Sequence, residues 1–227
     1  MRVRSEMAGD ISVTGNLSVF AAHGPISGSV TATGNIGQLA VHNPRHTAVT
    51  STGRIESGER MGTVLLRGDM DGAVVAGNGL NHLATYGTLR GSVNVNNGNL
   101  GVLRAINPGA TALHTGRGAG EGVFVNNGSA GQVLVHGDAR DSLVSVSRLL
   151  QRMVVSRDFQ DSSIEADRIG AVAIHGTTDG VGQNDVIHAM DASSSFVIVA
   201  NRERRVIDSV NEHTFADVGD GVRAFVG

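Results

Sequence analysis

The chain has 227 residues, of which 40% are hydrophobic, only 3% are aromatic and 32 are glycine. Its formal net charge of −3, with basic residues scattered along the chain, argues against nucleic acid as a partner. Cysteine is absent, which excludes disulfides and thiolate zinc sites, and the sequence predicts no membrane span because it has no apolar run of about eighteen residues.

A first short motif of the form Gly-Ser-Val-x-Val-x-Gly-Asn recurs from the start of the chain. It reads GDISVTGN from Gly9, GSVTATGN from Gly28, DGAVVAGN from Asp71, GSVNVNNGN from Gly91 and EGVFVNNGS from Glu121. Each copy alternates apolar and polar residues over a few positions before a turn residue interrupts it, which is the periodicity of a β-strand. The motif therefore predicts short strands separated by tight corners.

A second motif, apolar-Gly-x-Leu-x-Val-x-Gly, alternates with the first. Its first apolar positions are Leu17, Ile36, Met61, Leu80, Leu100, Ala130, Leu150 and Ile169. Most steps between them are about nineteen or twenty residues, the period of a stacked repeat. Two steps are longer, and we expect their extra residues, near 43–60 and 107–122, to leave the coil as loops or side strands.

This repeat predicts a right-handed single-stranded parallel β-helix (β-solenoid) of about ten coils of roughly 20 residues each. A sandwich or barrel of antiparallel hairpins would also have short strands, but it would not repeat the same corner residues. We predict a single domain over residues 1–227. From about residue 177 the repeat is less regular, although VIHAM, SFVIVAN and RRVIDSV still predict strands.

One recurring corner carries asparagine. Asparagine tolerates left-handed backbone geometry, and its amide can bond to the coils above and below. The sequence therefore predicts a structural ladder of Asn16, Asn35, Asn78, Asn97 and Asn127.

Acidic residues recur on two successive coils in HGDARDS and SRDFQDS. The candidate site residues are Asp138, Asp141, Asp158 and Asp161, with Arg140 and Arg157 between them. Carboxylates stacked on neighbouring coils could bind Ca²⁺ or act as the acid and nucleophile of a retaining glycosidase. The alternative is structural, with two aspartates in turns and two neutralised by the interleaved arginines.

Histidines recur where the second strand ends. The residue after the last apolar position is successively His42, Arg67, Tyr86, Ile106, His136, Ser156 and His175. No two histidines occupy adjacent coils in this column, so we predict no metal site there.

The alternation of GSVxVxGN and IGxLxVHG resembles the β-helix repeats of large bacterial surface proteins of the kind found in planctomycetes. The resemblance covers about residues 9–176, and there is a lesser similarity to bactofilins, which polymerise end to end. It implies a stiff repeat module with an extracellular or cell-surface location.

The leading hypothesis is a non-enzymatic structural or adhesive module with a carbohydrate or protein partner at its surface. The second is a polysaccharide lyase or glycosidase centred on Asp138 and Asp158, which the scarcity of aromatic residues disfavours. The third is a scaffold that self-assembles by stacking its coils end to end, with the tail after Arg202 as a cap.

Overall fold

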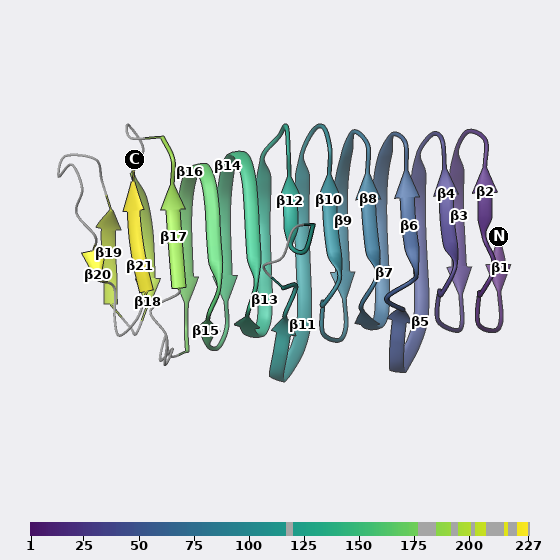
Figure 1. Cartoon of the computed structure of the whole chain (residues 1–227), viewed down its shortest axis with the longest axis horizontal. Helices are drawn as coiled ribbons and strands as arrows, with labels where there is room; N and C mark the ends of the chain where they lie inside the picture. The colour runs from purple at the N-terminus through teal and green to yellow at the C-terminus, as the bar shows by residue number, and fades with distance from the viewer. Residues whose placement is uncertain are drawn as a thin grey trace.

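The computed structural model describes residues 1–116, 120–176, 185–191, 195–200, 203–207, 216–217 and 222–226. These residues contain strands, turns and bends but no helix. The strands stack side by side along one long axis, with the N-terminus at one end (Figure 1). The molecule is the parallel β-solenoid that the repeat predicted.

The first face of the solenoid is a ladder in which each strand pairs in parallel with the equivalent strand of the next coil. The number of strands in this face agrees with the predicted number of coils. The strands are β2 (Ile11–Val13), β4 (Ser29–Ala32), β6 (Arg54–Ser57), β8 (Ala73–Ala76), β10 (Ser92–Val95), β12 (Val123–Val125), the first parts of β14 (Leu143–Val155) and β16 (Ser163–Ile174), β17 (Asp185–Ala189) and β21 (Val222–Val226).

The second face is a parallel ladder built in the same way. Its strands are β1 (Arg2–Val3), β3 (Leu17–Ala22), β5 (Ile36–Val49), β7 (Arg60–Met70), β9 (Gly79–Thr85), β11 (Leu100–Leu113), β13 (Ala130–Arg140), the second parts of β14 and β16, and β18 (Phe196–Ala200).

A third, narrow face closes each coil between the second face and the next strand of the first. It consists of short bridges, the ends of β5, β7, β11 and β13, and β15 (Phe159–Gln160). The inward column of this face runs through Met7, Ile26, Val49, Met70, Leu89, Leu113, Ala139 and Phe159.

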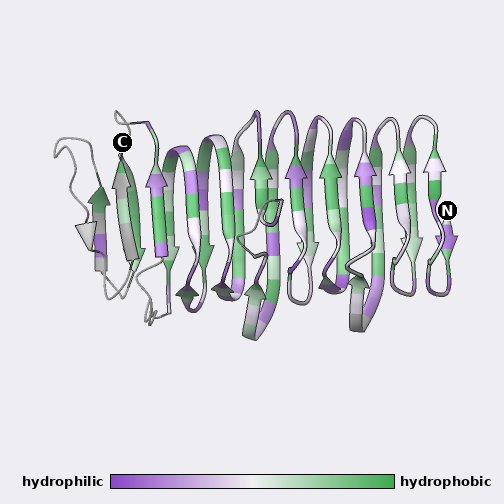
Figure 2. Cartoon of the chain, in the orientation of Figure 1, coloured by the Kyte–Doolittle hydropathy of each residue, from purple (hydrophilic) through white to green (hydrophobic). Residues whose placement is uncertain are grey.

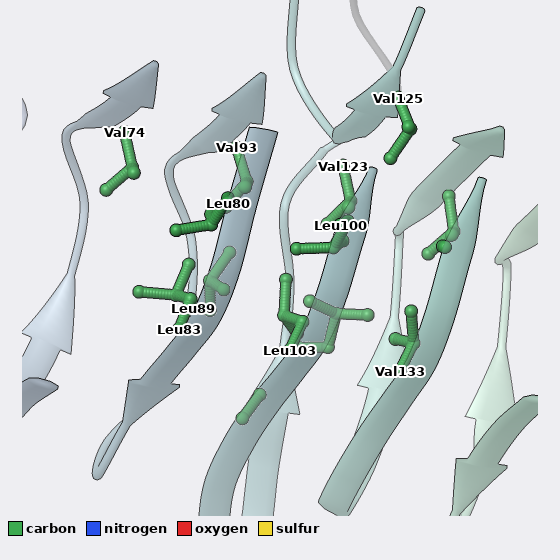
Figure 3. Packing of buried hydrophobic residues seen from close by; sticks show 14 of the residues in the cluster. Val74, Leu80, Leu83, Leu89, Val93, Leu100, Leu103, Val123, Val125 and Val133 are labelled. Carbon is green, nitrogen blue, oxygen red and sulfur yellow. The ribbon is translucent and has the colours of Figure 1, made fainter. Parts of the chain in front are cut away.

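The core is a set of vertical columns of aliphatic side chains. Val93 stacks on Val123 in the first face, Leu80 stacks on Leu100 in the second, and Leu89 fills the third corner; all are fully buried (Figure 3). Hydrophobic and hydrophilic bands alternate along the strands (Figure 2). Burying one such side chain stabilises the fold by about 1.5–3 kcal/mol, so a core with few aromatic rings is sufficient.

The predicted register of the second motif is confirmed residue by residue. Leu17, Ile36, Met61, Leu80, Leu100, Ala130, Leu150 and Ile169 are successive partners in the second-face ladder. The motif's glycine is explained by a close approach. A Cβ atom on Gly131 would lie 2.5 Å from the carbonyl oxygen of Gly101 on the coil before it. Glycine avoids this close contact at Gly131, although Ser18, Asn81 and Gln151 occupy the same column on other coils.

Both long coils let out four of their extra residues at the same corner, since the offset between paired residues falls from 25 to 21 along β5 and from 30 to 26 along β11. In the second long coil the offset falls again, from 26 at Gly116 and Ser142 to 21 at Val123 and Val144, within the predicted 107–122. Pairing of β5 with β7 is interrupted between His42 and Thr47, and pairing of β11 with β13 is interrupted between Ile106 and Thr111. These two coils project furthest in Figure 1. The first excursion is shorter than the predicted 43–60, because Arg54–Ser57 already belong to the first-face ladder.

The two excursions share a local structure. Both begin with Asn-Pro, and in both the asparagine amide donates to the backbone carbonyl four residues later. Asn43 donates to Thr47 at 2.9 Å, and Asn107 donates to Thr111 at 3.1 Å. This side-chain bond joins the start of each excursion to the residue at which pairing with the next coil resumes, and the Thr111 carbonyl also accepts from the Thr88 hydroxyl at 2.9 Å.

The C-terminal part continues both main ladders and then reverses direction. The three strands predicted there correspond to β17, β18 and β19 (Glu203–Ile207). However, β19 pairs antiparallel with β18, and β20 (Ala216–Asp217) pairs antiparallel with β21. The parallel repeat therefore gives way to antiparallel pairing in this region.

Candidate functional site

The predicted acidic residues lie at the corner between the second and third faces. Asp138, near the end of β13, is 4% exposed and forms ion pairs with two arginines. One carboxylate oxygen is 3.1 Å from Arg140 Nη2 and the other is 3.3 Å from Arg157 Nε, which belongs to the following coil. The carboxylate thus links two coils beneath the arginine side chains.

The excursion of β11 explains why Asp138 is buried. Gly137 precedes it, and a Cβ atom there would lie 2.4 Å from the Ala110 carbonyl oxygen and 2.7 Å from that of Asn107. The excursion backbone therefore packs directly against the strand that carries the aspartate. The corresponding glycine and aspartate after the first excursion are Gly68 and Asp69, so the same arrangement of loop and acidic strand end occurs twice.

The other three aspartates have different surroundings. Asp141 and Asp161 have φ angles of 42° and 48°, the left-handed geometry of turn residues. The Asp141 side chain is 57% exposed. Asp158 lies on the coil after Asp138, where its backbone carbonyl accepts from the Ala139 amide at 2.8 Å.

These aspartates do not form a metal site. Within the described ranges, no three His, Asp or Glu side chains come together as potential metal ligands. The predicted stacking of Asp138 over Asp158 is present, but the residues needed to coordinate Ca²⁺ with six to eight oxygens are not gathered around it.

A groove of about 550 Å³ lies beside this corner. We call it the corner groove; it is lined by Thr88, Arg90, Asn107, Ala110, Thr111, His114, Arg140 and Asp141. His114 Nδ1 is 3.2 Å from the Arg140 carbonyl oxygen and 3.7 Å from a carboxylate oxygen of Asp141. The groove therefore places an imidazole beside an exposed carboxylate.

Arg90 forms the opposite wall of the corner groove. Its Nη1 atom donates to Asp69 at 2.8 Å and to Asp71 at 3.0 Å. The hydrogen bond to Asp69 is the largest cause that raises the pKa of Arg90 above its ordinary value. Sequence reasoning missed Arg90 and His114; the available signal was that Arg90 follows Asp69 and Asp71 by about one repeat. His114 lies one coil beyond Arg90 in the same column, because Leu89 pairs with Leu113.

The asparagine corner contains side-chain bonds between coils. Asn35 donates its backbone and amide N–H groups to Asn16 Oδ1 at 2.8 and 3.0 Å, and Asn127 donates to Asn97 Oδ1 at 3.0 Å. In the coil between these two pairs, the Arg60 amide donates to Asn35 Oδ1 at 3.2 Å, and Asn78 donates to the Glu59 carboxylate. The register aligns Asn16 and Asn35 with Arg60, and Asn78, Asn97 and Asn127 with Glu59, so the predicted asparagines form two adjacent columns instead of one ladder. These bonds hold the corners together, and a small pocket of about 170 Å³ lies beside them, lined by Arg60, Asn78, Gly79, Asn81, Gly98 and Asn99.

The histidine column begins one coil earlier than predicted. Ala22 pairs with Val41, so His23 lies directly before His42, and their ring centroids are 6.0 Å apart. The expectation that no two histidines occupy adjacent coils is therefore wrong. The predicted column began at His42 and so did not include His23, which lies on the coil before it.

The chain has no detected relatives in the three comparisons: no protein-family model, no curated protein and no solved structure matches it. The part of the chain that the structure describes has no helix with the length and hydrophobicity required to cross a bilayer.

Proposed function

We propose that this chain is a non-enzymatic structural or adhesive module that presents a stiff β-solenoid surface to a carbohydrate or protein partner. One observation carries the proposal: the most buried of the candidate carboxylates, Asp138, is held by Arg140 and Arg157. An extracellular or cell-surface location is part of the same proposal and rests on the resemblance of the repeats to bacterial surface proteins.

The surroundings of Asp138 favour a structural role. A general acid or base must reach the proton it transfers, at about 2.6–3.2 Å or through one water. Asp138 is almost fully covered; Arg140 donates to its Oδ2 atom at 3.1 Å, and Arg157 Nε forms an ion pair with Oδ1 at 3.3 Å without a hydrogen bond. The side chain is better placed to fix the excursion corner than to meet a substrate.

The corner groove supports an alternative, a polysaccharide-acting enzyme. His114 and Asp141 lie 3.7 Å apart at the edge of a groove large enough for a sugar residue. A histidine and a carboxylate in such a position can in principle move a proton during glycan cleavage. The groove, rather than the Asp138 and Asp158 pair, is the better location for such chemistry.

A turnover assay separates the two functions. Purified protein is incubated with acidic and neutral polysaccharides, and new reducing ends and unsaturated uronyl products are measured. The adhesive module is expected to produce neither. Cleavage that disappears in Asp138→Ala, Asp158→Ala or His114→Ala would establish the enzyme instead and overturn the proposal.

End-to-end assembly has less support at the edge formed by β18. The backbone of that strand is already paired by the antiparallel strand β19, whose Arg204 is exposed. Charged edge strands oppose the addition of further strands. Sedimentation and electron microscopy at high concentration are therefore expected to show no filaments that grow from this edge.

A further inference from the structure

The outer surface of the second face carries arginines and no acidic side chains at its described positions. We call it the basic face and define it as the outward positions that align with Val19, Ala21 and His23 along the second-face ladder, from β3 to β18. In β7, for example, Met61, Val64 and Leu66 are buried while Thr63, Leu65 and Arg67 point outward. The basic face is thus the solvent side of the longest strands.

None of the described positions of the basic face holds an aspartate or a glutamate, although the whole chain has 21 acidic residues against 18 basic ones. It does hold the exposed side chains of Arg67, Arg104 and Arg152. The first face differs, because Glu56 and Glu165 occupy its outward positions. The basic face therefore carries positive charge without a carboxylate at its described positions, whereas the first face carries both signs, with Arg54 paired to Glu56 at 2.7 Å.

The three arginines follow a diagonal line. Arg104 is two strands beyond Arg67 and two residues earlier along the strand, and Arg152 is displaced from Arg104 in the same way. With strands about 4.8 Å apart and a rise of about 3.3 Å per residue, consecutive guanidinium positions are about 12 Å apart. This is a row of evenly and sparsely spaced cationic groups.

A hollow of about 360 Å³ adjoins the N-terminal end of this row. We call it the alanine hollow, because the small side chains of Ala21 and Ala40 leave room over the outer surface of β3 and β5. Leu65 continues its apolar lining, and His23, His42 and Arg67 supply its polar groups. An apolar floor with a few polar groups around it is the usual construction of a small-ligand site. Tyr86, which is 50% exposed, follows Arg67 in the same column.

We propose that the basic face binds an extended polysaccharide bearing carboxylate or sulfate groups, with one sugar residue in the alanine hollow and its anionic groups along the arginine row. The inference rests on the proposed adhesive function and names the surface and the partner class. Every cationic side chain of the Lys and Arg class in this chain is an arginine, and the planar guanidinium suits bidentate contact with carboxylate and sulfate oxygens.

The spacing favours this partner over other anionic polymers and surfaces. Duplex nucleic acid carries one charge per about 1.7 Å, far denser than one guanidinium per about 12 Å. A lipid surface rewards large apolar side chains that enter the acyl region. Among the described residues of this face, the large apolar side chains that are strongly exposed are Val19 (51%) and Tyr86 (50%), and two isolated side chains offer little to insert.

Binding is measured with immobilised wild-type protein and five probes: polygalacturonate, dextran sulfate, neutral dextran, vesicles with anionic lipid, and duplex DNA. The test variant is Arg67→Gln/Arg104→Gln/Arg152→Gln. The matched control, Arg54→Gln/Arg60→Gln/Arg148→Gln, removes the same charge from exposed arginines outside the basic face. Circular dichroism melts of both variants establish that each is folded.

We expect at least one acidic polysaccharide to bind, neutral dextran not to bind, and binding to weaken as salt is raised. The test variant is expected to lose about tenfold or more in affinity, since each of three exposed ionic contacts contributes a few-fold. The control variant is expected to stay within about twofold of wild type.

Three results would overturn the inference: no binding of either acidic polysaccharide, an equal loss in both variants, or vesicle or duplex DNA binding that is stronger than polysaccharide binding and shows the same loss. Product analysis on the bound polysaccharide keeps the two proposals distinct. Cleavage of a polysaccharide that the basic face holds would reject the non-enzymatic function while supporting the binding surface. Absence of both binding and cleavage would reject the surface alone.

Discussion

Replacing Asp138 by asparagine tests whether this residue stabilises the corner or serves chemistry. The change keeps the shape of the side chain and removes the charge that pairs with Arg140 at 3.1 Å and Arg157 at 3.3 Å. A hydrogen bond to a charged group contributes about 1.5–3 kcal/mol. Because both arginine side chains are 44% exposed, water recovers part of that interaction, and we expect a loss of about 2 kcal/mol.

Asp141→Asn is the matched control for that substitution. Its side chain is 57% exposed and its φ angle of 42° is one that asparagine also adopts, so the free energy of unfolding should change by less than about 0.5 kcal/mol. Denaturation by guanidinium chloride, followed by circular dichroism, compares the midpoints. If Asp138→Asn unfolds at the same midpoint as wild type, the ion pairs do not stabilise the corner and the structural argument fails.

Three further substitutions or titrations address the repeat itself. Gly131→Ala should cost about 1–3 kcal/mol by overpacking against the carbonyl of the preceding coil, whereas Gly9→Ala, with nothing within 4 Å, should be neutral or slightly stabilising; equal midpoints in denaturant would contradict this. Leu103→Ala, at a fully buried position, should cost about 2–5 kcal/mol in the same assay, and a loss below about 1 kcal/mol would mean that the site is not packed as described. The pKa of Asp10 is lowered, first by the Ser29 hydroxyl and then by the Ser29 amide, so its small stabilising contribution is present above the unfolded-state pKa and is lost as pH falls through the folded-state pKa; NMR titration should show a rise in this pKa in Ser29→Ala, and an unchanged value would refute the assignment.

Much of the fold could be predicted from the sequence because a solenoid converts sequence distance into vertical distance. The register of Leu17 through Ile169 needed only the recurrence of an apolar residue at about one repeat, which glycine follows at five of the eight positions. The reason for that glycine was not visible in the sequence, since the close approach of the Gly101 carbonyl to Gly131 depends on how two coils stack. The repeat in the sequence was therefore enough to predict which residues pair between coils, whereas the contact between stacked coils explains why glycine is used at Gly131.

The candidate site was less predictable. The sequence placed Asp138 and Asp158 on neighbouring coils with arginines between them, and the structure has this arrangement. It did not reveal that Asp138 is buried, because the covering backbone comes from the excursion around Asn107. It also missed His23, since the column of histidines was followed from the second complete coil onward.

The basic face could not be recognised from net charge or from local charge density. Its three arginines, Arg67, Arg104 and Arg152, are far apart in the sequence and do not belong to a run of basic residues. Only the register brings them onto one surface. Basic residues that are scattered along the sequence thus come to lie on one surface of the ladder.

At the corner that the two excursions share, residues can be added to a coil without changing which residues pair in the ladder. Each excursion leaves a strand, is closed by its own asparagine, and returns at a residue that resumes the same pairing. Insertions at this corner can consequently vary in length and chemistry while the core columns and the opposite faces keep their geometry. The corner is thus a natural grafting point, and a foreign peptide placed between Pro108 and Ala110 would be displayed at a fixed height on a rigid rod.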